Sequence, residues 1–187
     1  MAARKTIEDK IVDAALSLAA ERGWAPLTLA GIADAAKVPL ADLHGRFSGK
    51  GDILKAYSRR TDVNVLRAVD PEDQADERPK DRVFDVLMLR FDELRKNKEA
   101  VRAMAHDLVR DPAGLLSGAR PALRSMHWML EAASVDAGGI RGAVRARALA
   151  AVWLAAFRVW LDDGDDMNKT MAELDKRLQQ SSALWGT

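Results

Sequence analysis

Apolar residues recur every three or four positions along most of the chain, and this spacing places them on one face of an α-helix. No stretch shows the alternating pattern of a β-strand or the turn dipeptides of a hairpin. The pattern predicts an all-α fold of about nine helices. They are expected at residues 7–22, at two short segments between 28 and 50, and at 50–68, 83–94, 100–109, 121–133, 140–161 and 167–184.

Residues 28–50, with the sequence TLAGIADAAKVPLADLHGRFSGK, predict two short helices that meet at a tight turn. Thr28 is placed to cap the first helix, and Pro39 suits the first turn of the second. The apolar sides of both helices are expected to face a shared core of Leu29, Ile32, Ala33, Ala36, Leu43 and Phe47. This arrangement is typical of a helix-turn-helix, whose second helix can enter a DNA groove.

The composition excludes several other classes of protein. Apolar residues make up 48% of the 187 residues, too many for a disordered chain, and the absence of cysteine excludes disulfides and thiolate metal sites. No apolar signal core opens the chain, and no uninterrupted apolar run approaches the ~18 residues of a membrane span. A cytoplasmic protein without a membrane span is therefore expected.

The net charge of +1 combines +3 over residues 1–60 with −2 over residues 61–187. A basic first third suits a DNA-contacting head joined to a body with another role. A solvated surface can also carry this small excess with no polyanion partner, so charge alone leaves both interpretations open.

Nothing in the sequence indicates catalysis, a metal or a cofactor. The three histidines, His44, His106 and His127, do not form a metal-binding motif, and there is no Gly-x-Ser-x-Gly elbow or glycine-rich phosphate loop. The DDGDD run at 162–166 lacks the ligand order of a calcium loop and predicts a solvated turn before the last helix. We expect a protein that is not an enzyme.

The helix-turn-helix segment resembles the TetR family of bacterial transcriptional regulators. The family's usual run is Ile-Ala, a small residue, a turn, then Leu-aromatic-x-His-Phe and a Lys that opens the next helix. Here it stands as Ile32-Ala33, Ala36-Lys37-Val38, Leu43-His44-Gly45-Arg46-Phe47 and Lys50. The resemblance implies a TetR-like fold with a DNA-binding domain at 1–49 and an effector-binding and dimerisation domain at 50–187. It also implies a homodimer, operator DNA with palindromic half-sites, a repressor role and release by a small hydrophobic ligand.

Carried over by position, the DNA-binding residues are Thr28, Leu40, Ala41, Asp42, His44, Arg46 and Lys50. Phosphate contacts are implied for Thr28, His44, Arg46 and Lys50, and groove contacts for the other three.

The groove-facing residues depart from what base readout needs. Leu40 and Ala41 offer no hydrogen bond to a base edge, and Asp42 would repel phosphate unless it accepts from a cytosine amino group. Lys37 occupies the turn usually given to glycine, where a positive φ costs roughly 1 kcal/mol, and Gly45 weakens the second helix by a similar amount. A helix-turn-helix kept for folding alone is the alternative.

Methionine and aromatic residues of the later helices are candidates to line an apolar effector pocket. They are Met88, Phe91, Met104, Met126, Trp128, Met129, Trp153 and Phe157. Arg90, Arg147 and Arg158 are candidates to anchor an acidic headgroup. The same spacing is equally typical of an ordinary helical core, with the arginines as surface ion-pair partners.

The last two helices are candidates for a dimer interface, as the resemblance implies. Small residues would let a neighbouring helix approach closely, and larger apolar ones would add contact area. The predicted interface residues are Ala143, Val144, Ala151, Leu154, Ala155, Leu174 and Leu178. These faces would otherwise pack only within one chain.

A second resemblance concerns the C-terminal part. Leu149–Trp153, the run Trp160-Leu161-Asp162-Asp163 and residues 167–178 look like the coenzyme Q biosynthesis accessory protein, a TetR-like fold that binds isoprenoid lipids and not DNA. The alternative function is therefore a lipid-binding accessory protein of ubiquinone biosynthesis with a vestigial helix-turn-helix. Phe47 and Lys50 favour the regulator, whereas the apolar reading face favours the lipid binder.

Overall fold

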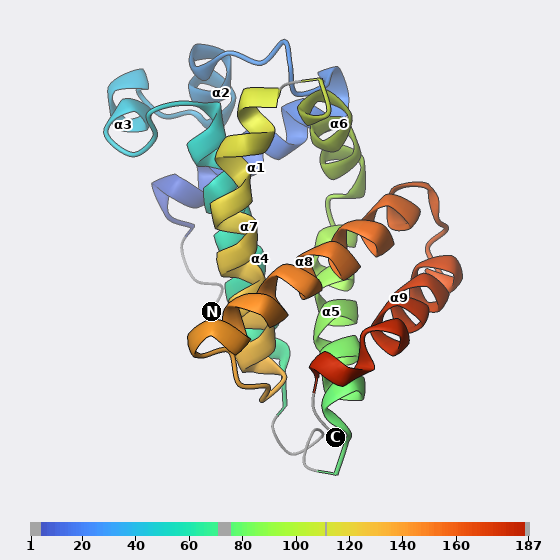
Figure 1. Ribbon diagram of the computed structural model, residues 1–187. Coiled ribbons are helices and arrows are strands. Elements are labelled where there is room, and N and C mark those ends of the chain that lie inside the picture. The colour runs from blue at the N-terminus through green and yellow to red at the C-terminus, as the bar shows by residue number, and fades with distance from the viewer. Residues whose placement is uncertain (1–4, 71–75, 111, 186–187) are drawn as a thin grey trace. The chain divides into compact units, whose positions relative to one another are not determined.

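The computed structural model describes residues 5–70, 76–110 and 112–185 (Figure 1). The described residues form helices and no strand, so the all-α prediction of about nine helices is confirmed. The elements are α1 (Ile7–Arg22), α2 (Leu29–Ala36), α3 (Leu40–His44), α4 (Lys50–Ala68), α5 (Pro79–Arg95), α6 (Lys98–Leu108), α7 (Pro112–Ala132), α8 (Gly139–Asp162), α9 (Asn168–Gln180) and a 3-10 helix, η1 (Ser182–Leu184).

Several helix boundaries differ from the prediction, and α5 already begins at Pro79 instead of residue 83. The α7 helix begins at Pro112, and Pro121 lies inside it instead of opening it. A proline removes one intrahelical hydrogen bond, and the residues on both sides nevertheless continue the helix. The predicted last helix is divided, because α9 ends at Gln180 and a separate turn, η1, leads to the buried Trp185.

The chain forms two compact units, and the first comprises residues Met1–Arg60 and Asn97–Ala119. Thr6 begins α1 with a capping box, in which its hydroxyl accepts from the Asp9 amide and the Asp9 carboxylate accepts from the Thr6 amide. The buried side of α1, which includes Ile11 and Ala19, lies within this unit, where α1 packs against α2 and α6. Unit 1 therefore contains the helix-turn-helix together with α6.

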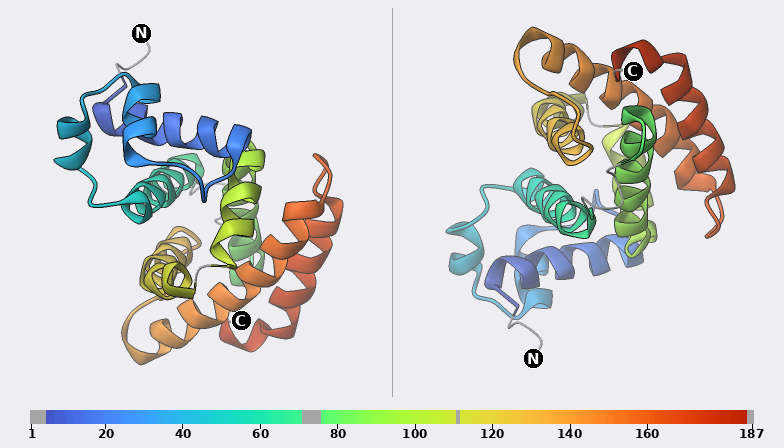
Figure 2. Two further views of the ribbon diagram at one scale, coloured as in Figure 1. Left: turned by 90° about the horizontal axis from the view of Figure 1, so that it is seen from above. Right: turned by 90° about the horizontal axis from the view of Figure 1, so that it is seen from below.

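The second unit comprises Thr61–Lys96 and Arg120–Thr187. In it α8 and α9 lie side by side, and α9 also packs against α5 (Figure 2). Phe91, Trp160 and Leu174 are fully buried, so large apolar side chains from α5, α8 and α9 form its core.

The boundaries between the units lie within α4, after Arg60, between α5 and α6, after Lys96, and within α7, after Ala119. The division predicted from the sequence, 1–49 and 50–187, concerns roles and not packing, and it stays a prediction. Packing groups α6 with the N-terminal helices, a grouping that no local sequence pattern indicates.

Gly142 lies in the first turn of α8, where the backbone of the preceding loop comes very close to the helix. A Cβ at this position would lie 1.8 Å from the carbonyl oxygen of Ala137, so only glycine fits without movement of backbone. Gly142 had no assigned role in the sequence, and its role is this close approach.

The DDGDD run is not simply the solvated turn expected from the sequence, because Asp163 is buried. Its side chain is buried, and its Oδ2 accepts from both the amide and the hydroxyl of Thr170, each at 2.7 Å. Burial would raise the pKa of Asp163, but the bonds from Thr170 and Gly164 outweigh it and hold the pKa below its usual value. Asp163 thus joins the end of α8 to the first turn of α9.

In the described part of the chain, every helix is too short or too polar to cross a bilayer.

Candidate DNA-binding surface

Helices α2 and α3 form the helix-turn-helix expected from the sequence. The Thr28 hydroxyl accepts from the Gly31 amide at 3.1 Å, which confirms the predicted cap of α2. Ile32, Ala33 and Leu43 are almost completely buried, and Phe47 is 4% exposed, so the predicted shared core is present.

The turn between the two helices places a lysine in the left-handed region. Lys37 has φ 56° and ψ 45°, as predicted for the position that is usually glycine, and its amide donates to the carbonyl oxygen of Asp34 at 3.1 Å. A residue with a Cβ is strained there, so the turn is held by its surroundings and not by its own preference.

Helix α3 is shorter than expected. It ends at His44, and Gly45 follows it with φ −63° as the residue after the last helical position. Gly45 keeps right-handed φ and ψ at the end of this helix, and the expected cost of glycine there stays a prediction.

Most of the residues proposed to contact DNA lie exposed on α2 and α3 or next to them. Leu40 is 51% exposed, and Thr28, Ala41, His44 and Arg46 are also exposed, whereas Asp42 is half-buried. The Arg46 guanidinium donates to the backbone carbonyl oxygen of Asp42 at 2.8 Å. The structure thus gathers these residues, and their contacts with DNA stay a prediction.

Lys50, the remaining member of that set, already binds backbone groups of its own chain. Its ammonium donates to the carbonyl oxygens of Trp24 and Ala25 at 3.0 and 2.9 Å, and it lies 5.5 Å from the centre of the Trp24 ring. No pattern in the sequence indicates these bonds, because Lys50 and the loop before α2 lie far apart along the chain.

The effector candidates in unit 2 include a stack of aromatic rings. Phe91 stacks on Trp153 with ring centres 4.2 Å apart, and Phe157 lies near both Trp153 and Trp160. Met126 and Met129 are buried in this unit and Met88 is half-buried.

Two other effector candidates lie apart from this stack. Trp128 is 48% exposed, and Met104 lies on α6, where it is buried within unit 1. A ligand contact by any of the eight candidate residues stays a prediction.

Arg90, a candidate anchor for a ligand, is buried and paired with a residue of its own chain. Its Nη1 forms an ion pair with Asp62, which also accepts from the Ser125 hydroxyl at 2.7 Å. The guanidinium carbon lies 5.2 Å from the centre of the Trp153 ring. Arg147 and Arg158 are exposed, and Arg147 donates to the carbonyl oxygen of Ala143.

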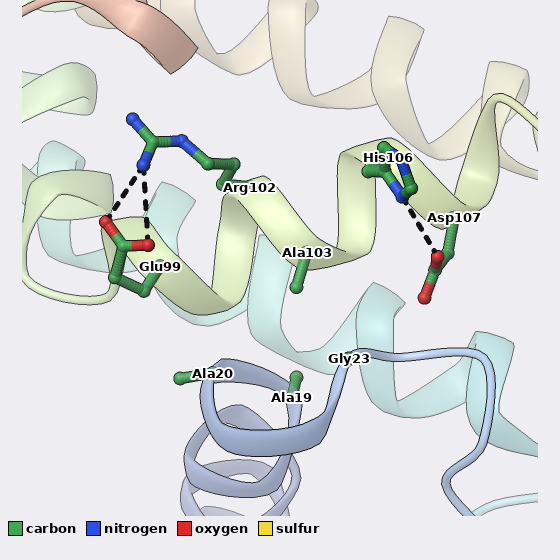
Figure 3. A pocket seen from close by; sticks show the side chains of 8 residues that line it. All are labelled: Ala19, Ala20, Gly23, Glu99, Arg102, Ala103, His106 and Asp107. Atoms are coloured by element: carbon green, nitrogen blue, oxygen red, sulfur yellow. Dashed lines mark hydrogen bonds and ion pairs between the residues drawn. The ribbon is translucent and has the colours of Figure 1, made fainter.

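A cavity of about 300 Å³ lies in unit 1 between the end of α1 and α6 (Figure 3). It is lined by Ala19, Ala20, Gly23, Glu99, Arg102, Ala103, His106 and Asp107, and none of the predicted effector residues lines it. Among the described residues no group of three or more histidine or acidic side chains is arranged to hold a metal ion.

Helix α8 has apolar residues on two opposite sides. One side, with Leu149, Ala156 and Trp160, is buried within unit 2. The other side follows the predicted dimer interface: Val144 and Leu154 are each 48% exposed, Ala143 and Ala151 are exposed, and Ala155 is half-buried.

Leu174 and Leu178 cannot belong to that outer surface. Both are fully buried on α9, which packs against α5 and α8 of the same unit, so their side chains serve the core of this chain. The helical spacing alone did not distinguish a core face from an outer face.

Comparison with known proteins supports the family resemblance. Residues 11–57 match the model of the bacterial regulatory proteins of the tetR family. This segment covers most of α1, all of α2 and α3, and the first part of α4. No curated protein matches the chain.

Several solved structures share the fold along most of the chain. A TetR transcriptional regulator from Nitrosomonas europaea is 22% identical with a TM-score of 0.77, covering 96% of this chain and 99% of that one. A TetR regulator from Rhodococcus sp. RHA1 is 18% identical, with a TM-score of 0.67 and coverage of 93% and 94%. SmeT, the repressor of the Stenotrophomonas maltophilia multidrug efflux pump SmeDEF, is 22% identical, with a TM-score of 0.57 and coverage of 98% and 92%.

These findings confirm the resemblance to TetR regulators and the TetR-like fold. The second resemblance, to the coenzyme Q biosynthesis accessory protein, finds no support in them, and the lipid-binding alternative is not favoured.

Proposed function

We propose that this chain is a TetR-type transcriptional repressor, which binds operator DNA as a homodimer and is released by a small hydrophobic ligand. The observation that carries the proposal is the agreement between two findings over the same residues. The segment that matches the tetR family model, 11–57, is also the segment that forms a helix-turn-helix with a capped first helix and a buried core.

For DNA binding, the exposed side chains around α3 are the proposed contacts. His44 and Arg46 carry donors that suit phosphate oxygens, and Thr28 lies at the start of α2, where its hydroxyl and free amides are near each other. Leu40 and Ala41 would touch the methyl group of thymine, so the groove contacts contribute shape more than hydrogen bonding. The head is thus expected to depend largely on backbone contacts.

For dimer formation, the outer side of α8 is the proposed interface. It is apolar and exposed along several turns, with Ile140 86% exposed in addition to Val144 and Leu154. An isologous dimer through this face would relate the two heads by a two-fold axis, as half-sites ~34 Å apart require.

For release, the aromatic stack of unit 2 is the proposed ligand region. A hydrophobic ligand there would act through α4, since this helix continues from unit 1 into unit 2. The ligand must bind the released state more tightly than the DNA-bound state, because only differential affinity shifts the population.

The test is binding of the purified protein to labelled duplex DNA from the region upstream of its own gene, measured by fluorescence anisotropy at several salt concentrations. We expect affinity that falls steeply with salt, because phosphate contacts release counterions. Arg46→Ala should weaken binding to every duplex alike and reduce the salt slope by about one.

Arg59→Ala is the matched control. Arg59 is another exposed arginine of unit 1, which pairs with Glu8 and lies outside the proposed contacts. The proposal fails if the wild type shows no affinity for DNA at low salt, or if the two variants lose affinity equally.

A further inference from the structure

The short segment Trp24-Ala25, between α1 and α2, is held from both sides by charged side chains. The amides of Trp24 and Ala25 donate to Oδ2 of Asp107 at 2.9 and 2.6 Å. The carbonyl oxygens of the same two residues accept from Nζ of Lys50 at 3.0 and 2.9 Å. All four backbone polar groups of these two residues are therefore bound by Asp107 of α6 and Lys50 of α4.

The packing of α1 on α6 brings Asp107 to this segment. Figure 3 shows Asp107 near the C-terminal end of α6, beside the loop that leaves α1 at Gly23. Ala19 and Ala103 face the cavity between the two helices, so small side chains separate them there. Gly23 has φ 82°, which a residue with a Cβ rarely adopts, and this turn directs the next two amides towards Asp107.

Both charges lie at the helix end that disfavours them. Lys50 is the first residue of α4, where the helix dipole is positive, and Asp107 lies in the last turn of α6, where it is negative. Neither charge therefore serves its own helix, and the bonds to the loop compensate for its position. The Ala25 amide lowers the pKa of Asp107, against the opposing effect of burial, and His106 and the Trp24 amide lower it further.

We propose that Asp107 and Lys50 are positioning residues of the DNA-binding head. By fixing Trp24-Ala25 they fix the entry to α2, which is capped at Thr28 only three residues later. In this role Lys50 acts through the loop and not as an independent phosphate contact. The inference rests on the proposed function, because it concerns how well the head is placed to bind DNA.

Asp107→Ala separates this role from simple electrostatics by the sign of its effect. Removal of a carboxylate from a DNA-binding protein should strengthen DNA binding if charge alone mattered. We expect the opposite, a loss of at least about tenfold in affinity for the upstream duplex, because two backbone amides lose a charged acceptor. Glu99→Ala is the matched control, since Glu99 is a carboxylate of the same helix that pairs with Arg102 of that helix.

Lys50→Met separates positioning from phosphate binding by the salt slope. If Lys50 is a positioning residue, Lys50→Met should lower the affinity without changing the salt slope. If Lys50 contacts a phosphate, its loss should reduce the slope by about one. Lys55→Met is the control, because Lys55 lies on the same helix and pairs with Asp52. In the double variant the two losses should not add, since both residues act on one segment.

Hydrogen exchange at the Trp24 and Ala25 amides gives a readout that does not depend on DNA. We expect slow exchange in the wild type and at least about tenfold faster exchange in Asp107→Ala.

If Asp107→Ala fails to fold, the exchange rate of these two amides in the wild type is the test. Exchange at the rate of an open loop would overturn the proposal. It is also overturned if Asp107→Ala binds DNA as tightly as the wild type, or if Lys50→Met alone lowers affinity with a reduced slope. A wild type that binds no DNA refutes the proposed function, and the exchange of these amides still tests the positioning bonds.

Discussion

The two units use charged side chains in different surroundings. In unit 1, Lys50 and Asp107 bind backbone groups of a loop, and the Asp107 side chain keeps 20% of its surface exposed. In unit 2, the side chains of Arg90 and Asp62 are 7% and 13% exposed and pair with each other, and the Arg90 guanidinium lies over the Trp153 ring. Water can replace a lost partner more easily at Asp107 than at the Arg90–Asp62 pair. We therefore expect substitutions of these charged residues to disturb stability most in unit 2 and DNA binding most in unit 1.

The largest effect is expected when the buried pair is broken. Arg90→Met should lower the free energy of unfolding by about 3–5 kcal/mol, because among the described residues the Asp62 carboxylate then keeps only the Ser125 hydroxyl as a partner. Urea denaturation measures this directly. The double variant Arg90→Met with Asp62→Leu should recover most of the loss. A double variant as unstable as the single one would show that the buried charge is not the cause.

Gly142→Ala tests how rigid the packing of unit 2 is. The added methyl group would overlap the backbone of Ala137, so the loop before α8 must move, at a cost of roughly 2–3 kcal/mol. Gly118→Ala is the control, since a Cβ there meets nothing within 4 Å and alanine should stabilise the helix by ~0.5–1 kcal/mol. Equal unfolding midpoints for the two variants would contradict the close approach at Gly142.

The parts of the fold that were predictable depend on neighbours in sequence. Thr28 caps the helix that begins at the next residue, and Lys37 adopts the left-handed turn that its place between two helices requires. The helical spacing of apolar residues likewise predicted α4 at its observed bounds. Such features are determined within one or two turns of helix, so a single sequence contains the information.

The parts that were missed depend on residues far apart along the chain. Asp107 binds amides 82 and 83 positions away, and Asp163 was taken for a solvated residue although Thr170 draws it into the core. Leu174 and Leu178 have the spacing of an apolar helix face, which does not reveal whether the face lies against the same chain or a second copy. Tertiary packing decides these cases, and helical periodicity does not encode it.

A pH-dependent effect is expected on the surface of unit 2. Partial desolvation, with repulsion from Glu77 and Asp81, raises the pKa of Asp85 to about 6. The folded state then binds a proton that the unfolded state has released, so this group's contribution to stability falls as pH rises from about 4 to 6. Asp85→Asn should stabilise the protein at pH 7 by less than ~1 kcal/mol, because water screens the exposed carboxylate, and should have little effect at pH 4.

The measurement for Asp85 is urea denaturation of both proteins at the two pH values. Asp92→Asn is the control, since Asp92 lies on the same helix but pairs with Arg95. An equal gain from Asp92→Asn at pH 7 would point to a general charge effect instead of local repulsion at Asp85.

The smallest effect is expected at the turn of the head. Lys37→Gly should stabilise the protein by a few tenths of a kcal/mol, because relief of the strained φ of 56° is partly offset by the greater freedom of glycine in the unfolded chain. Lys37→Ala removes the same charge but keeps the Cβ, so the difference between the two variants is free of the effect of charge, and glycine should again be the more stable by a few tenths of a kcal/mol. Thermal unfolding of the pair gives that difference. If alanine were as stable as glycine, the turn would not be strained, and the head would owe its arrangement to its own local preferences more than to the residues that hold it.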